Sequence, residues 1–171
     1  MFDNNTLFLQ IFGLARQNAL LDGVFIFGAR ELIFIMYFLV FVLILLGGPK
    51  ERKAFLILIL GLIISESFIQ ITHLFFNEPR PYVTFNLIPL IHHIPNPSFP
   101  SGHATLSAII AFAYLFTKSK YSLLFVLTAI WVGFSRIFVG VHYPLDVLGG
   151  IFYALFSIFL ASKVLNKFLN I

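Results

Sequence analysis

The stretch PSGHATLSAIIAFAYLF, residues 100–116, opens on proline, serine, glycine and histidine and continues as an apolar run without Asp, Glu, Lys or Arg. Proline suits the first turn of a helix, where backbone N–H groups lack intrahelical acceptors. We therefore predict a helix that enters lipid from a polar end. A second stretch, SRIFVGVHYPLD at 135–146, again places polar groups beside the end of an apolar run.

Outward from these two stretches the chain is strongly apolar. Of its 171 residues 60% are hydrophobic and 11% are charged, whereas a soluble domain carries roughly 25% charged residues. We predict an all-α fold, a polytopic transmembrane helical bundle formed as one domain over residues 1–171. Cysteine is absent, which excludes a disulfide, a thiolate metal site and a cysteine nucleophile. No feature indicates nucleic acid or an obligate protein partner.

Five membrane spans are expected, because a crossing needs about 20 apolar residues. Residues 4–20 mix apolar with polar residues and predict an N-terminal interfacial helix, followed by a second interfacial or re-entrant piece over 21–29. The alternative is a sixth span over 7–28, which would bury Arg16 and Asp22 in lipid at a few kcal/mol each. The five predicted spans are 31–46, 54–76, 103–116, 121–139 and 147–164.

Basic residues lie in the turns on one side of these spans and in the C-terminal tail. The positive-inside rule makes that side cytoplasmic. We therefore expect a cytoplasmic C-terminus in a multi-pass protein of the cell membrane, with the polar stretches at the extracytoplasmic face. The basic residues are Lys50, Arg52, Lys53, Lys118, Lys120, Lys163 and Lys167.

The first polar stretch is a candidate anion site. Free amides at a helix start bind anions, the Ser101 hydroxyl adds a donor, and Gly102 lets a ligand approach the backbone. His103 follows directly and is placed to exchange a proton with a bound anion. The alternative is a helix cap with an interfacial histidine.

The second stretch adds a histidine and a carboxylate. Pro144 is expected to open the last span, which places Asp146 in its first turn, within reach of the His142 ring. An aspartate on one ring nitrogen leaves the other as a nucleophile, although Asp146 also suits the helix dipole. Arg136 matches phosphate oxygens or reaches headgroups from lipid. Arg80, between two prolines, is either an aimed cation or a loop residue.

Together, Arg80-Pro81, the PSGH at 100–103 and Ser135-Arg136 with His142 and Asp146 resemble the three signature motifs of the type 2 phosphatidic-acid phosphatase superfamily. The flank at 75–81 and the segment 13–27 are similar to the bacitracin-resistance type of undecaprenyl pyrophosphate phosphatase. One position departs from the superfamily pattern, since His73 stands where a lysine is usual. The phosphate-binding cation there is therefore missing, or present only when His73 is protonated.

The resemblance implies roles for these residues. His142 would attack phosphorus and form a phosphohistidine, with Asp146 orienting it. His103 would protonate the leaving oxygen and then activate water. No metal or cofactor is required, because the positive field comes from arginines and helix-start amides. The groups that would hold the phosphoryl oxygens are Arg80, Ser101, Gly102 and Arg136.

Other polar residues are candidates for supporting roles. Glu66, Gln70 and His73 share one helical face that leads toward Arg80. Glu66 is interpreted as a buried hydrogen-bonded strut between helices, or as a residue that positions an arginine. Glu78 lies beside Arg80. His92 and His93 are loop histidines that are either solvated or contact a pyrophosphate.

Three functions are compared. The first is hydrolysis of undecaprenyl pyrophosphate to undecaprenyl phosphate and phosphate. The second is the same chemistry on phosphatidylglycerol phosphate, a phosphatidate or the lipid A 1-phosphate. The third is a transporter or proton-conducting protein, which would need ionisable groups at mid-membrane on several spans, whereas only Glu66 is so placed.

Overall fold

The computed structural model describes residues 3–94 and 96–169, and the regular structure in these ranges is helical. Short loops join the helices, apart from the long connection between α5 and α6. The helices are α1 (Asn4–Phe12), α2 (Ala19–Arg30), α3 (Leu32–Leu46), α4 (Pro49–Phe75), α5 (Pro81–Thr84), α6 (Gly102–Phe116), α7 (Ser122–Phe138) and α8 (Pro144–Leu169).

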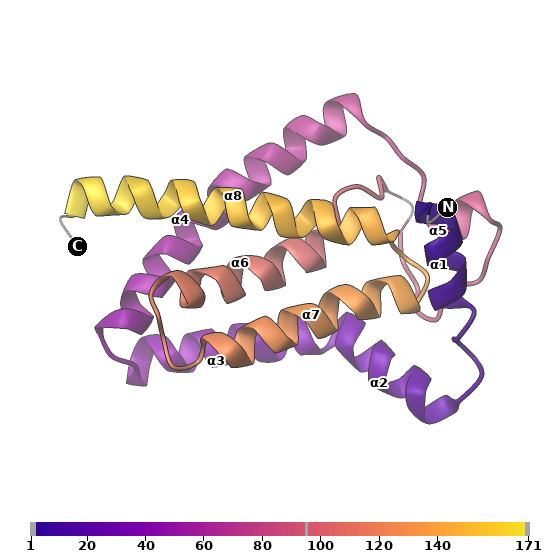
Figure 1. Ribbon diagram of the computed structural model, residues 1–171, viewed down its shortest axis with the longest axis horizontal. Helices are drawn as coiled ribbons and strands as arrows, with labels where there is room; N and C mark the ends of the chain where they lie inside the picture. The colour runs from indigo at the N-terminus through magenta and orange to yellow at the C-terminus, as the bar shows by residue number, and fades with distance from the viewer. Residues whose placement is uncertain (1–2, 95, 170–171) are drawn as a thin grey trace.

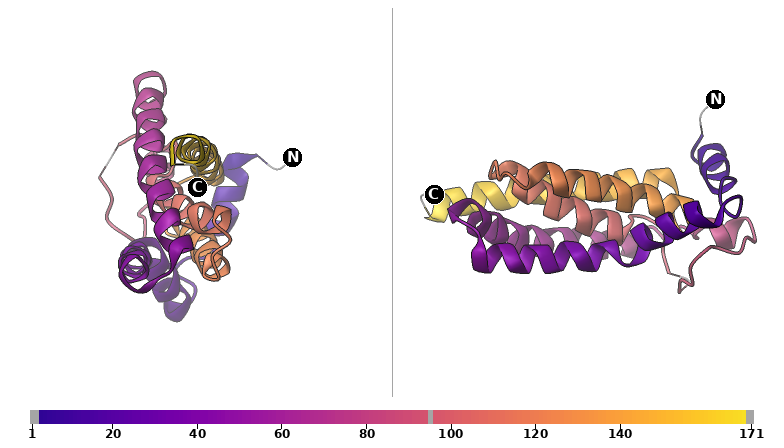
Figure 2. Two further views of the ribbon diagram at one scale, coloured as in Figure 1. Left: turned by 90° about the vertical axis from the view of Figure 1, so that its left-hand side faces the viewer. Right: turned by 90° about the horizontal axis from the view of Figure 1, so that it is seen from below.

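The α3, α6, α7 and α8 helices run lengthwise beside one another, and α4 crosses them obliquely (Figure 1). Helix α6 is central, because it packs against α4, α7 and α8. Its buried side chains include Ala104, Ala108, Ala111 and Ala113, which let the neighbouring helices approach closely. The bundle is elongated (Figure 2), and the start of α6 points toward the end where α1 and α5 lie (Figure 1).

That end of the bundle collects segments that are far apart in the sequence. The α7–α8 corner, the long loop before α6, and helices α1 and α5 all lie there, while the C-terminus lies at the far end (Figure 1). The predicted helix starts are confirmed: α6 begins at Gly102 with Ser101 as its N-cap, and α8 begins at Pro144. Arg136 occupies the last turn of α7, as predicted.

The bundle has the character of an integral membrane protein. By length and apolar composition α4 and α8 qualify as membrane spans within the described residues, and α2 with α3 qualifies as one span bent by 49°. Helices α6 and α7 are shorter apolar helices of 15 and 17 residues. Large apolar side chains cover the outside, for example Phe34 at 68% exposure and Leu46 at 83%. The number of spans stays a prediction.

The predicted N-terminal helix is present, but its predicted bounds of 4–20 are wrong. Helix α1 ends at Phe12, and the chain turns at Arg16, whose φ of 64° is left-handed. Asp22 stabilises this turn by accepting the Arg16 backbone N–H at 3.0 Å, and Asn18 caps α2. The same break rules out one continuous helix over 7–28.

Helix α1 packs onto the α7–α8 corner through an aromatic cluster. Phe8 is fully buried, stacked on Phe85 with ring centroids 5.9 Å apart and edge-on to Tyr143 at 5.5 Å. Gly140 makes the turn with a φ of 89°, and a Cβ there would run into the Phe12 ring. Glycine is therefore required at this position, both for its left-handed backbone conformation and because the Phe12 ring occupies the space of a side chain. The position lies at the start of the corner that carries His142.

The far end of the bundle is basic and joined by polar contacts between turns. The Lys50 ammonium donates to the Lys118 carbonyl at 3.1 Å, which links the α3–α4 turn to the α6–α7 turn. The buried Glu51 carboxylate accepts the Ser119 hydroxyl at 2.6 Å. The basic turns therefore lie opposite the end that carries His142, His103 and the buried arginines.

Candidate active site

His142 lies in the short corner between α7 and α8 and is 1% exposed. Its two ring nitrogens have different neighbours. Asp146 Oδ2 lies 3.3 Å from Nδ1, and Arg80 Nη1 lies 2.9 Å from Nε2 and 3.4 Å from Nδ1. A guanidinium only donates, so Nε2 accepts from Arg80 and Nδ1 carries the proton that Asp146 accepts. This tautomer leaves the Nε2 lone pair facing Arg80.

The charge state of His142 follows from its surroundings. Burial, together with the positive charges of Arg136 and Arg80, holds the pKa of the imidazole well below its usual value of 6.5. The ring is therefore neutral near pH 7. A neutral imidazole with an orienting carboxylate has the properties of a nitrogen nucleophile.

Arg80 reaches His142 from the loop after α4. Its side chain donates from Nη1 to the Val141 carbonyl at 2.9 Å and from Nε to Asn96 Oδ1 at 3.0 Å. Arg80 is 4% exposed, and burial lowers its pKa while the nearby Asp146 carboxylate opposes that shift. Pro81 opens α5 directly after it, so the backbone around the cation is stiff.

Two further groups present hydrogen-bond donors without protein acceptors among the described residues. Arg136, 2% exposed, donates from Nη1 to the Ala29 carbonyl at 2.9 Å, while its Nε and Nη2 have no partner. The Ser101 hydroxyl is fully buried and also unpaired. Unpaired buried donors are costly, so both groups are candidates for binding an oxyanion.

A polar pocket of about 260 Å³ lies beside Arg80 and His142. His103, in the first turn of α6, lines it together with His142 and Arg80. No heavy atom lies within 4 Å of the Cβ position of Gly102, so a ligand has room beside the helix start. The pocket is lined by Glu66, Ile69, His73, Arg80, His93, Asn96, Pro97, Pro100, Gly102, His103 and His142.

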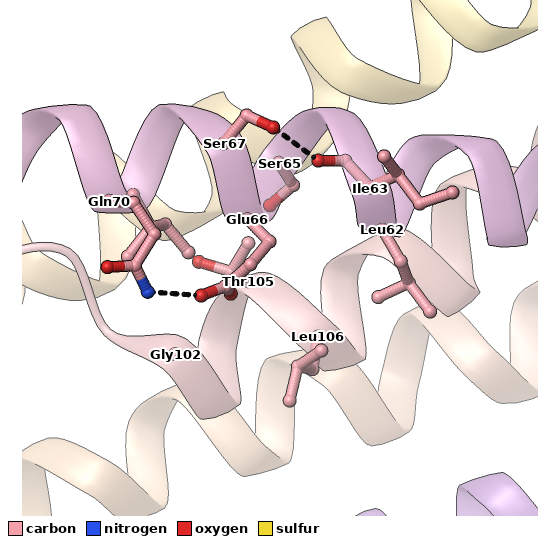
Figure 3. A pocket seen from close by; sticks show the side chains of 10 residues that line it. Leu62, Ile63, Ser65, Glu66, Ser67, Gln70, Gly102, Thr105 and Leu106 are labelled. Atoms are coloured by element: carbon pink, nitrogen blue, oxygen red, sulfur yellow. Dashed lines mark hydrogen bonds between the residues drawn. The ribbon is translucent and has the colours of Figure 1, made fainter.

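A larger apolar groove of about 710 Å³ lies between α4 and α6 and shares Glu66, Ile69 and Gly102 with the polar pocket. Figure 3 shows the side chains of the two helices that line it, with Leu62 and Leu106 further along from Gly102. Within it Gln70 donates to Glu66 at 2.5 Å. Groove and pocket together offer an apolar surface next to a cationic one.

Not all residues that were candidates for supporting roles lie at the polar pocket. Glu66 and His73 line the polar pocket, but Glu66 is exposed and its hydrogen bond stays inside α4, so it is not a buried strut between helices. The Glu78 side chain is exposed. His93 lines the pocket with its ring centroid 6.3 Å from that of His142, whereas His92 is exposed.

Two residues that sequence reasoning missed lie in the loop before α6. Asn96 binds Arg80, and the buried Ser98 donates to Asp146 Oδ2 at 2.5 Å. Neither belongs to a pattern with a fixed spacing to its partner, so only the folded loop shows the contact. In the described ranges no three His, Cys, Asp or Glu side chains group as metal ligands.

The fold and the site define a membrane-embedded helical protein with a cationic, histidine-containing pocket at one end of the bundle. Residues 54–169 match the family model described as PAP2 superfamily, and the chain belongs to that superfamily. It is therefore a lipid phosphatase of this group, and the resemblance inferred from the motifs is confirmed.

Similar proteins agree with the assignment. The undecaprenyl-diphosphatase BcrC of Bacillus subtilis is 37% identical over 98% of this chain and 89% of its own length. A lipid A 1-phosphatase of Rhizobium johnstonii is 43% identical over 47% of this chain and 33% of its own. The crystal structure of Aquifex aeolicus LpxE superposes with a TM-score of 0.75 at 26% identity, covering 95% of this chain and 96% of that one.

Proposed function

We propose that this protein hydrolyses undecaprenyl pyrophosphate to undecaprenyl phosphate and inorganic phosphate. The observation that carries the proposal is the placement of His142 between Asp146 and Arg80 in a pocket that continues into an apolar groove. The near full-length similarity to the Bacillus undecaprenyl-diphosphatase favours this lipid. A long isoprenoid chain suits the groove, and a pyrophosphate suits the cationic pocket.

In the proposed reaction the terminal phosphoryl group displaces His142 as the acceptor of the Arg80 Nη1 proton, which frees Nε2. Nε2 then attacks phosphorus, and the bond to the bridging oxygen breaks as His103 gives that oxygen a proton. Asp146 stabilises the positive charge that develops on the imidazole. Water, deprotonated by His103, then attacks the phosphohistidine and releases phosphate.

The remaining donors hold the equatorial oxygens during both steps. Arg136 offers Nε and Nη2, Ser101 offers its hydroxyl, and Gly102 offers its backbone amide at the start of α6. Each is fixed by the protein before substrate arrives, because Arg136 is tied to the Ala29 carbonyl and the Ser101 amide donates to the Asp146 carbonyl at 3.0 Å. His73 and Glu66, which line the pocket, and Glu78, beside Arg80, are proposed to have supporting roles only.

The site is proposed to face the extracytoplasmic side, with the C-terminus in the cytoplasm. The basic turns and tail lie at the far end of the bundle, which the positive-inside rule assigns to the cytoplasm. The chain has no cysteine, so single cysteines at Asn86 and Lys118 give a direct test. An impermeant maleimide added to intact cells should label the first and spare the second; the reverse would overturn this orientation.

The second candidate is the same chemistry on another phosphorylated lipid, and the partial similarity to a lipid A 1-phosphatase favours keeping it. Phosphate release by the purified protein is measured on undecaprenyl pyrophosphate, phosphatidylglycerol phosphate, phosphatidate and lipid A, with His142→Ala as the control. We expect the highest kcat/KM on undecaprenyl pyrophosphate. Equal values on all four lipids would remove the support for that substrate.

A further inference from the structure

The tripeptide Asn96-Pro97-Ser98 lies in the long loop before α6 and contacts both partners of His142. Its first two residues hold Arg80. The guanidinium donates from Nε to the Asn96 backbone carbonyl at 3.2 Å and to Asn96 Oδ1 at 3.0 Å, and from Nη2 to the Pro97 carbonyl at 3.3 Å. These three acceptors fix the plane of the guanidinium, since its donors form a rigid fork.

The third residue holds Asp146. Ser98 is fully buried, and its hydroxyl donates to Asp146 Oδ2 at 2.5 Å. Oδ2 also accepts the Tyr143 backbone N–H at 2.8 Å and faces His142 Nδ1, while Oδ1 has no partner among the described residues. The hydrogen bonds therefore act on the oxygen that meets the imidazole.

Ser98 is in turn fixed from its other side. Its backbone N–H donates to the Glu78 carbonyl at 2.8 Å. Glu78 lies two residues before Arg80, so the segment that carries the arginine and the segment that orients the carboxylate are bonded to each other.

We propose that Asn96, Pro97 and Ser98 form a positioning clamp that sets the Arg80 guanidinium and the Asp146 carboxylate in register on the two nitrogens of His142. The inference rests on the proposed function, because it concerns the geometry of that nucleophile. Ser98 and Asn96 are positioning residues and not catalytic ones, since they act through Asp146 and Arg80. The Asn96 side chain is exposed, so replacing it removes little packing.

The main test uses Ser98→Ala with kcat and KM measured separately for phosphate release from undecaprenyl pyrophosphate in detergent. A lost hydrogen bond to a charged group is expected to lower kcat roughly 10- to 100-fold, with KM changed less than about threefold. The matched control is Ser107→Ala, a buried serine on α6 whose hydroxyl donates to the Ala104 carbonyl of its own helix. It is expected to keep the wild-type kcat.

A double-mutant cycle separates positioning from general stability. If Ser98 acts through Asp146, then Ser98→Ala has no further effect on the residual rate of an Asp146→Ala protein, and Asn96→Ala has none in an Arg80→Ala protein. Losses that multiply in both cycles, or a wild-type kcat for Ser98→Ala, would overturn the clamp.

These outcomes are distinct from a failure of the proposed function. The proposed function fails if the wild-type protein and His142→Ala release phosphate from every lipid of the panel at the same rate. If release depends on His142 with another lipid, the same variants are measured on that lipid. The proposed clamp is then tested by kcat and by the two double-mutant cycles alone.

Discussion

Arg80 Nη1 lies 2.9 Å from His142 Nε2, although the two residues are 62 positions apart in the sequence. The contact joins the loop after α4 to the α7–α8 corner, and both side chains are buried. A cation on the ring nitrogen keeps the imidazole neutral and holds a donor where a phosphoryl oxygen is expected.

Arg80→Lys is expected to lower kcat/KM about 100-fold, the loss typical when one fixed donor to a developing oxyanion is removed. Lysine lacks the planar fork that reaches Asn96, Pro97 and His142 together. Phosphate release is the measurement, and Arg30→Lys is the control because Arg30 is exposed and pairs only with Glu31 at 3.5 Å among the described contacts. A kcat/KM of Arg80→Lys within a few-fold of the wild-type value would contradict a role that needs the planar guanidinium.

Gly28→Ala is expected to impair folding and activity together. A Cβ at this position would lie 2.7 Å from Trp131 Nε1 and closer still to Ser135 Oγ, so α2 must move away from α7. Overpacking of this kind costs about 1–3 kcal/mol, and the move displaces the Ala29 carbonyl that holds Arg136.

Gly23→Ala is the matched control for that change, because it lies on the same helix with no heavy atom within 4 Å of its Cβ position. It is expected to leave activity unchanged and to raise stability by roughly 0.5–1 kcal/mol. Thermal unfolding in detergent and phosphate release measure both variants. Equal unfolding temperatures and equal phosphate release for Gly28→Ala and Gly23→Ala would show that the α2–α7 contact is not tight.

Acidification is expected to remove the stability that a neutral His93 contributes. Burial lowers the pKa of His93 to about 4. The unfolded state therefore binds more protons once the pH falls below about 6.5, so stability is full above that pH and declines toward about 4.

The measurement for this prediction is the unfolding temperature between pH 7.5 and 5. His93→Asn, which does not titrate, is expected to flatten the dependence. An unchanged slope in this variant would exclude His93 as a contributor.

Glu66→Gln is expected to fold normally and to retain most activity. The glutamate is exposed in the groove and bonds only to Gln70 on its own helix among the described contacts, a pair that an amide reproduces. Phosphate release and thermal unfolding test this. A folded but inactive variant would show that the negative charge itself is needed.

Sequence patterns predicted those features of the fold that residues close together in the chain determine. The start of α6 at the PSGH stretch and the start of α8 at Pro144 follow from proline and helix-end preferences, and they bring His103, His142 and Asp146 to one end of the bundle. The placement of Asp146 near His142 follows from a spacing of four residues. The roles of these residues stay predictions.

Tertiary contacts determine the parts that the sequence did not predict. The helix expected over 4–20 breaks because Asp22 binds the Arg16 backbone N–H and stabilises a left-handed residue. Asn96 and Ser98 lie in a loop of 17 residues, 85–101, between α5 and α6, whose path depends on Arg80 and Asp146. No periodicity indicates such contacts.

The central claim is that His142 becomes phosphorylated during turnover, and rapid quenching of the enzyme with lipid labelled in its terminal phosphate measures it directly. We predict an acid-labile, base-stable label on His142 that forms during turnover and is absent from His142→Ala. Turnover without any such label, or an equal label in His142→Ala, would contradict the account.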